Sequence, residues 1–425
     1  MVKLDQEIEE KVNGLTLHVV ETKKYKTNTL VLKMKAPLTK EDVTKRALLP
    51  YVLQSATKQH PTSTELRSYL DELYGASLSV DLGKKGEYHI ITIRLEIANE
   101  VYLSDQTPLL DKGLTLLSEI LLHPALENGA FIPSVIEKEK RSLKQRIQSV
   151  FDDKMRYASL RLVEEMCKNE PYALHANGQM EDVDQISAPS LYEYYQRSIK
   201  EDEIDLYIVG DVQVQEIKNS VEKLFSLESR VPKNIEKNTI SIDKENEVIE
   251  EQDVKQGKLN IGYRTNITYH DSEYYALQVF NGIFGGFSHS KLFINVREKA
   301  SLAYYAASRV ESHKGLLMVM SGVDAKNYDQ AVTIIKEQMT AMKNGDFTDK
   351  ELEQTKAVLR NQLLETIDTS RGLIEVLYND VLAEVKQPIE DWLTKIEEVT
   401  KEQIIEAGAK IELDTIYFLK GKEEA

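Results

Sequence analysis

The spacing of hydrophobic residues divides the first half of the chain into strands and helices. Leu30, Leu32 and Met34 alternate with polar or small neighbours, which predicts two short strands within Leu15–Ala36. Further along the chain, apolar residues recur at helical spacing, and Thr, Asp and Pro residues typical of helix starts precede them. The pattern predicts helices from Thr39–Asp42 onward, from Pro61–Thr64 to about Gly75, and over Pro108–Leu122 and Asn128–Asn169, and strands over Ser77–Asp81, His89–Ile97 and Asp205–Val209.

The second half repeats this order of elements. It predicts strands over Lys258–Arg264, Ala303–Val310 and Gly315–Gly322, and helices over Ser272–Phe284, His289–Lys299, Tyr328–Met342 and Asp349–Val385. Segment Phe131–Leu143 aligns without gaps on Phe347–Leu359, with identical residues at Phe131/Phe347, Glu137/Glu353, Lys140/Lys356 and Leu143/Leu359. We therefore expect two duplicated α+β halves, over 1–227 and 247–425. The polar, charged stretch 228–246 is typical of a linker.

Composition narrows the class of protein. The 425 residues include 54 Lys and Arg against 70 Asp and Glu, a net charge of −16 at pH 7. Such an acidic chain repels phosphate, which argues against nucleic-acid partners and anionic membranes. No apolar run approaches the roughly 18 residues of a membrane span, and the acidic N-terminus does not resemble a targeting peptide. We expect a cytoplasmic protein.

The residues that usually carry chemistry are scattered. No two of the eight histidines lie within four residues of each other, so the sequence has no helical pair of histidines that could bind a metal ion. The eight are His18, His60, His89, His123, His175, His270, His289 and His313. A site assembled from distant histidines stays open. Cys167 lies among acidic residues that disfavour a thiolate nucleophile. We expect no bound metal and no cofactor.

A glycine-rich stretch in the second half is a candidate binding segment. Gly285 and Gly286 either bring backbone close to a ligand or form a tight turn between helices. Arg297 and Tyr304 follow, seven residues apart, near a helix end and a strand start. A guanidinium and a phenol together suit a peptide carbonyl or a carboxylate. On their own, such a pair more often consists of ordinary surface and interface residues.

The segment Ser288–Tyr304 resembles a signature of the pitrilysin/insulinase superfamily of zinc metallopeptidases. It contains Ser-x-Leu-Phe and then Arg-Glu-Lys-x-x-Leu-Ala-Tyr, and the resemblance covers nearly the whole chain. It is nearest to the bacterial branch related to the mitochondrial processing peptidase, and implies two halves that each contain a mostly antiparallel sheet packed by helices. It also implies that Arg297 and Tyr304 hold the substrate backbone.

The chain departs from this family at its zinc site. The family's His-x-x-Glu-His positions fall on Leu48, Tyr51 and Val52, and a later Glu ligand falls on Arg146. Two apolar side chains cannot bind zinc, and a phenol cannot replace the carboxylate that activates zinc-bound water. A cation at a ligand position also opposes a metal.

The resemblance therefore implies a non-catalytic subunit of a heterodimeric zinc peptidase acting on unfolded peptides. A homologous partner would supply zinc and general base, with self-association in its absence. The peptide would add as a strand to a sheet edge, for which Ser77–Asp81 is a candidate. The alternative is a scaffolding pseudopeptidase without a role in proteolysis. An enzyme built on unrelated residues is a third hypothesis, without support in the sequence.

Overall fold

The chain folds into two compact units. The computed structural model describes residues 6–104, 107–230, 232–233, 235, 242 and 244–422. One unit combines Met1–Gln148 with Leu174–Glu236, and the other combines Ser149–Ala173 with Lys237–Ala425. We call them unit 1 and unit 2. Part of the predicted linker 228–246 lies outside the described residues.

Unit 1 contains a six-stranded, mostly antiparallel sheet. Its order is β1 (Glu7–Val12), β2 (Leu15–Glu21), β8 (Glu203–Gly210), β3 (Thr27–Pro37), β5 (Tyr88–Ala98), β4 (Ser77–Lys85), and only β2 and β8 run parallel to each other. The edge strand β4 is the longer form of the predicted strand Ser77–Asp81. Leu30, Leu32 and Met34 of β3 belong to the core on one face, as predicted, while Val31 and Lys33 between them are buried as well.

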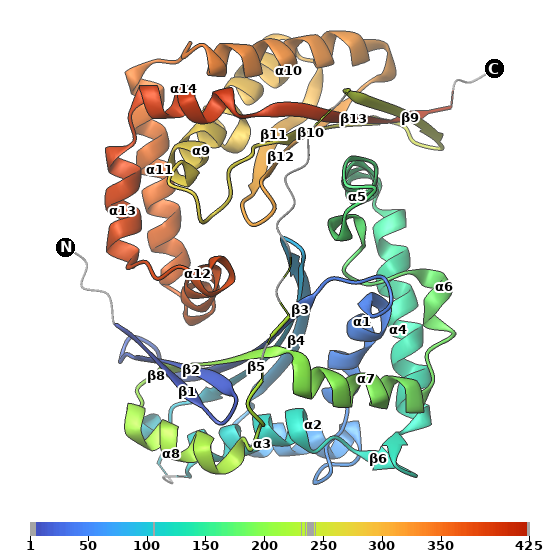
Figure 1. The fold of residues 1–425 in the computed structure, drawn as a ribbon, viewed down its shortest axis with the longest axis vertical. Coiled ribbons are helices and arrows are strands. Elements are labelled where there is room, and N and C mark those ends of the chain that lie inside the picture. Colours follow the sequence, from blue (N-terminus) through green and yellow to red (C-terminus); the bar gives the residue numbers. More distant parts are fainter. Residues whose placement is uncertain are drawn as a thin grey trace. The chain divides into compact units, whose positions relative to one another are not determined.

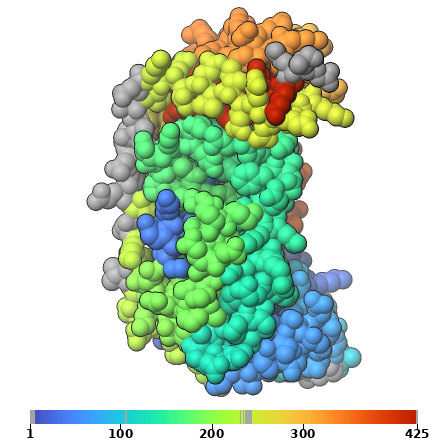
Figure 2. Space-filling model, turned by 90° about the vertical axis from the view of Figure 1, so that its right-hand side faces the viewer, coloured from blue at the N-terminus to red at the C-terminus, as the bar shows by residue number. Residues whose placement is uncertain are grey.

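Helices cover that apolar face of unit 1. They are α1 (Val43–Leu53), α2 (Ser63–Glu72), α3 (Leu109–Leu122), α4 (Pro133–Asp152), α6 (Met180–Val183), α7 (Ala188–Glu201) and α8 (Val214–Leu224). Helix α1 contacts both α6 and α7, and Figure 2 shows a patch of blue N-terminal residues enclosed by green residues of that region. Helix α1 contains Leu48, Tyr51 and Val52, so its packing determines where these three residues lie.

Unit 2 contains a five-stranded sheet with the order β11 (Ala303–Glu311), β12 (Leu316–Val323), β10 (Gly257–Arg264), β13 (Glu412–Gly421), β9 (Asn246–Gln252). One face packs against α9 (Tyr274–Asn281), the π-helical segments η3 (Gly282–Gly286) and η4 (Phe293–Lys299), α10 (Tyr328–Lys343), α11 (Asp349–Ile367), α13 (Ile389–Glu398) and α14 (Lys401–Ala409). Figure 1 shows these helices stacked on one side of the sheet. Helix α12 (Ser370–Ala383) follows α11.

The two units share one topology, which confirms the predicted duplication of an α+β fold. Strands β4-β5-β3-β8-β2 correspond in order to β11-β12-β10-β13-β9, and the parallel pair β2/β8 matches β9/β13. The aligned lysines make equivalent contacts. Lys140 Nζ donates to Glu137 (3.0 Å) and to the carbonyl of Ile186 (3.1 Å). In unit 2, Lys356 Nζ donates to Glu353 (3.1 Å) and to the carbonyl of Glu397 (3.0 Å).

The predicted helix Asn128–Asn169 is wrong as a single element. A two-stranded hairpin, β6 (Leu126–Glu127) with β7 (Ala130–Phe131), precedes α4, and α4 ends before a second helix, α5 (Lys154–Met166). Asp153 causes the break, because its carboxylate accepts from the backbone N–H groups of Met155 (3.0 Å) and Arg156 (3.2 Å) and caps α5. The predicted helix Asp349–Val385 is likewise interrupted, at the N-cap Thr369 of α12.

Helix α5 belongs to unit 2 although it follows the first half of the chain. Tyr157, Leu162 and Met166 pack on β10 and β13, on the face opposite to the other helices. The division into units therefore differs from the predicted half 1–227 at residues 149–173. The helix break at Asp153 is the physical reason, since it lets the apolar face of α5 pack on the sheet of unit 2.

Within the described ranges, no helix combines the length and the apolar character that spanning a membrane requires.

Candidate functional site

Helix α1 is held in unit 1 by a buried arginine near its start. Arg46 is 1% exposed, and its guanidinium donates to Asp202 (2.6 Å), Tyr194 (3.1 Å) and the carbonyls of Met34 and His89 (2.7 and 3.1 Å). These bonds join α1 to β3, β5 and the end of α7. A buried cation bonded through all three guanidinium nitrogens fixes a helix firmly, because any displacement would leave charge unpaired.

Three of the residues that the sequence predicts at the zinc-site positions, Leu48, Tyr51 and Val52, lie on this fixed helix. Leu48 and Val52 are buried in the apolar core of unit 1. Tyr51 turns toward α4, where the guanidinium carbon of Arg146 lies 3.5 Å from the centre of its ring. Leu48, Tyr51, Val52 and Arg146 are thus neighbours in one region, and that region is filled by packed side chains.

These residues do not fit a zinc ion. Zinc needs Cys, His, Asp or Glu donors, whereas Leu48 and Val52 carry none and Arg146 is a cation. The described part of the chain contains no group of three or more His, Cys, Asp and Glu residues placed to hold a metal ion. A carboxylate that acts on Arg146 is that of Glu139 on α4, whose Oε1 lies 3.4 Å from Ser55 Oγ and 3.3 Å from Lys138 Nζ.

Arg297 and Tyr304 lie on neighbouring elements of unit 2 and point outward. Tyr304 is 81% exposed on the edge strand β11, and Arg297 is exposed on η4, which packs beside β11. Neither side chain makes a hydrogen bond or an ion pair with another described residue. Arg297 stacks on Phe293, whose ring centre lies 4.5 Å from the guanidinium carbon. The sequence reasoning missed this stack, which the i, i+4 spacing could have indicated.

Backbone irregularities set the direction of both side chains. Pairing of β11 with β12 shifts between Ala303 and Ala306, so β11 carries a bulge that includes Tyr304 and Tyr305. Bulges redirect side chains and occur often beside functional sites. The turn from η4 to β11 places Ser301 at φ +52°, and the N–H of Leu302 closes it by donating to Val296 O (3.1 Å). π-Helical turns such as η4 are also common at functional sites.

The two glycines differ in their surroundings. A Cβ on Gly285 would lie 2.5 Å from Ser308 Oγ and 2.8 Å from the Ser308 backbone nitrogen, so this glycine permits close packing of η3 on β11. Gly286 is exposed, and its nearest neighbour to a Cβ would be Asn281 at 3.0 Å. Packing therefore explains Gly285, and Gly286 is the glycine whose backbone faces solvent.

The predicted peptide-docking edge is partly occupied by the chain itself. Strand β4 is an edge strand, paired only with β5. The carbonyl of Leu78 accepts from Gln54 Nε2 (3.0 Å), and the N–H of Leu82 donates to Asp81 Oδ1 (2.8 Å). In an antiparallel strand, every second residue directs its backbone N–H and C=O away from the paired strand, here Leu78, Val80 and Leu82. The N–H and C=O of Val80 therefore lie between the two bonded groups of Leu78 and Leu82 and remain open.

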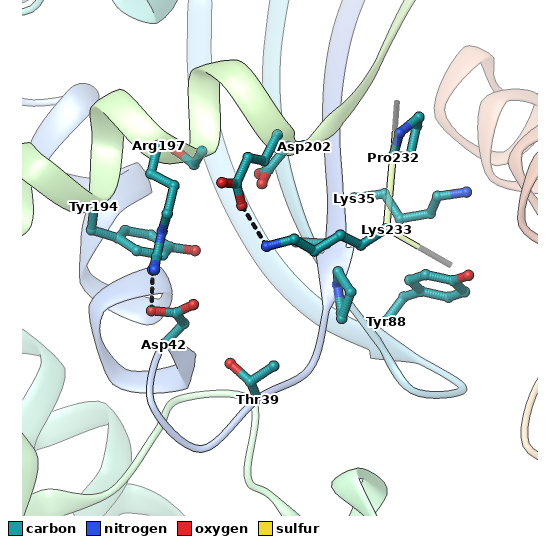
Figure 3. Close-up of a pocket in the computed structure, with 13 residues that line it drawn as sticks. Lys35, Thr39, Asp42, Tyr88, Tyr194, Arg197, Asp202, Pro232 and Lys233 are labelled. Atoms are coloured by element: carbon teal, nitrogen blue, oxygen red, sulfur yellow. Dashed lines mark hydrogen bonds and ion pairs between the residues drawn. The ribbon is translucent and has the colours of Figure 1, made fainter. Parts of the chain in front are cut away.

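A pocket of about 80 Å³ opens in unit 1 between the end of β3, the start of α1 and α7. Its cations already have partners: Arg197 binds Asp42, Lys233 binds Glu201 (2.7 Å), and Lys35 binds Glu203 (2.7 Å). In Figure 3, Arg197 points to Asp42 and Lys233 extends across the pocket to a carboxylate. Matched charges leave little net attraction for an ionic ligand, so we assign no site here.

Comparisons with known proteins give a consistent picture. Residues 185–359 match the family model described as the peptidase M16 inactive domain. A Bacillus subtilis protein named probable inactive metalloprotease YmfF is 64% identical over 420 residues, 99% of each chain. The mitochondrial-processing peptidase subunit beta of Saccharomyces cerevisiae is 23% identical, over 69% of this chain and 66% of its own. A crystal structure of a conserved protein from Enterococcus faecalis has a TM-score of 0.92 and 36% identity, covering 99% of both chains.

Proposed function

The chain belongs to the M16 peptidase family, of the pitrilysin and insulinase type and in its inactive form, and we propose that it is the substrate-binding subunit of a heterodimeric zinc peptidase. In this proposal a homologous partner supplies the zinc ion and the general base. This chain supplies Arg297 and Tyr304, which hold the backbone of an unfolded peptide. The proposed location is the cytoplasm.

The observation that carries the proposal is the state of Arg297 and Tyr304. An exposed guanidinium and an 81% exposed phenol, without hydrogen-bond partners among the described residues, retain their full capacity for a ligand. A bulge and a π-helical turn hold both in place, which a merely solvated surface does not require. A planar guanidinium suits a peptide carbonyl or carboxylate, and the phenol can donate to the same group.

The mode of binding in this proposal is strand addition. An extended peptide has unpaired N–H and C=O groups, and a sheet edge offers matching ones. Within unit 1, the open groups of Val80 on β4 offer one point of attachment. Within unit 2, Gly286 offers exposed backbone. Because Leu78 and Leu82 are capped, we expect attachment at β4 to be short and the Arg297/Tyr304 region to dominate affinity.

The test is purification of the tagged, full-length chain from its native cell, with mass spectrometry of the proteins that accompany it. The proposal expects a partner of similar size that carries His-x-x-Glu-His on a helix, in near-equal amount. Peptide cleavage should appear in the complex, should be lost with a chelator, and should be absent from the chain alone. Recovery of a complex without such a partner, and without peptidase activity, would favour the scaffolding alternative.

A further inference from the structure

We propose that the stacked pair Tyr51–Arg146 is a structural crosslink between α1 and α4, and that it closes this site to metal ions. The proposal concerns residues of unit 1 and does not rest on the proposed function. It starts from the mismatch between these residues and zinc. A metal ion bound by residues of α1 and α4 would join the two helices. In this chain, the guanidinium of Arg146 on α4 lies against the ring of Tyr51 on α1 instead.

The contact is close enough to be a specific interaction. The guanidinium carbon of Arg146 lies 3.5 Å from the ring centre of Tyr51, well inside the roughly 6 Å that defines a cation–π contact. A separation of this size is van der Waals contact between a planar cation and the ring face. The two residues lie on different helices, so the contact joins α1 to α4 rather than neighbours on one helix.

Burial strengthens this contact. Burial lowers the pKa of the Arg146 guanidinium, while the nearby Tyr51 and Glu139 act in the opposite direction. The cation has therefore exchanged part of its water for the ring face and a carboxylate. A desolvated cation–π pair stabilises the folded state by roughly a factor of thirty in the folding equilibrium constant, against a few-fold at an exposed site.

A second contact lies beside the stack. Glu139 is seven residues before Arg146 on α4, which places both on one face of the helix. The carboxylate of Glu139 faces the hydroxyl of Ser55, just after α1, at 3.4 Å. Ser55 Oγ also donates to the carbonyl of Tyr51 (2.8 Å), so the end of α1 is tied to the residue that carries the stack.

The same arrangement repels a metal ion. A divalent cation at this place would meet the guanidinium of Arg146 and the ammonium of Lys138, two positive charges beside the carboxylate of Glu139. Leu48 and Val52 contribute core packing in place of donors. Restoring the histidines and the glutamate of an active relative would therefore not restore a metal site while Arg146 remains.

The crosslink is tested by a double-mutant cycle on the full chain, with Tyr51→Leu, Arg146→Leu and the double variant, measured by urea unfolding. We expect a coupling of roughly thirty-fold in the unfolding equilibrium constant. The exposed ion pair Lys144–Asp184 (2.6 Å), which also starts from α4, is the matched control and should couple only a few-fold. If the effects of the Tyr51 and Arg146 substitutions on the unfolding equilibrium constant combine independently to within twofold, the crosslink proposal is overturned.

Closure to metal is tested by elemental analysis after dialysis against zinc. The triple variant Leu48→His, Tyr51→Glu, Val52→His should retain no stoichiometric zinc. Adding Arg146→Glu should give about one zinc per chain, with circular dichroism as the check of folding. One tight zinc in the triple variant would overturn the claim, and so would a folded fourfold variant that binds none.

Discussion

Replacement of His18 should remove a pH-dependent part of the stability of unit 1. His18 on β2 is 1% exposed and lies between two carboxylates, Glu7 of β1 at 2.8 Å and Asp205 of β8 at 3.1 Å. Its ring stacks on Tyr207 with centroids 4.2 Å apart. Burial alone would lower its pKa, but the hydrogen bonds to Asp205 and Glu7 outweigh burial and raise the pKa from 6.5 to about 9.

The sign and the size of the effect follow from this shift. Because the folded state binds the proton more tightly than the unfolded state, the contribution is fully present below pH 6.5 and is lost as the pH rises through 9. A pKa difference of about 2.5, at 1.36 kcal/mol for each pKa step, corresponds to about 3 kcal/mol.

The assay is urea unfolding of the wild type and His18→Gln from pH 6 to 9.5, followed by far-ultraviolet circular dichroism. We expect the free-energy difference between the two proteins to shrink by about 3 kcal/mol between pH 6 and 9. His123→Gln, at an exposed histidine, is the control and should keep a constant difference. A constant difference for His18→Gln as well would refute the ion-paired state of the imidazole.

Three further outcomes follow from buried contacts. Arg46→Met should cost on the order of 3–5 kcal/mol in urea unfolding, because Asp202 would remain buried without its cation; a loss below about 1 kcal/mol would contradict this. Gly285→Ala should cost roughly 1–3 kcal/mol and Gly286→Ala clearly less, since only the first Cβ meets backbone of β11; equal losses would argue against the packing role. Burial lowers the pKa of His175 to about 4, so the wild type should lose stability relative to His175→Gln as the pH falls from 6.5 to 4; a pH-independent difference in thermal midpoint would exclude a buried neutral imidazole.

Much of the fold could be predicted from the sequence because hydrophobic periodicity and turn residues act locally. Alternation in β3 and β5 and the duplicated Phe131 and Phe347 segments indicated both sheets and their repetition. Helix α5 shows the limit of such reasoning. Its apolar face is visible in the sequence, but which sheet that face covers depends on the direction of the chain after Asp153.

The sequence named candidate residues but not their geometry. The sequence indicated that Leu48, Val52 and Arg146 cannot form a zinc site, yet it held no sign that Arg146 stacks on Tyr51 from another helix. The bulge that turns Tyr304 outward depends on pairing with β12, which no local pattern encodes. The burial of His18 between two carboxylates likewise required the parallel pairing of β2 with β8.

The most direct test of the account is peptide turnover by the complex reconstituted from this chain and the proposed zinc-bearing partner. Removal of one transition-state donor typically lowers turnover by roughly 10²–10³. Arg297→Ala and Tyr304→Phe should each lower turnover to this order, with assembly and zinc content unchanged. Arg309→Ala, at an exposed arginine of the same strand, should retain the full rate. Full turnover by the Arg297 and Tyr304 variants in an intact complex would contradict the account.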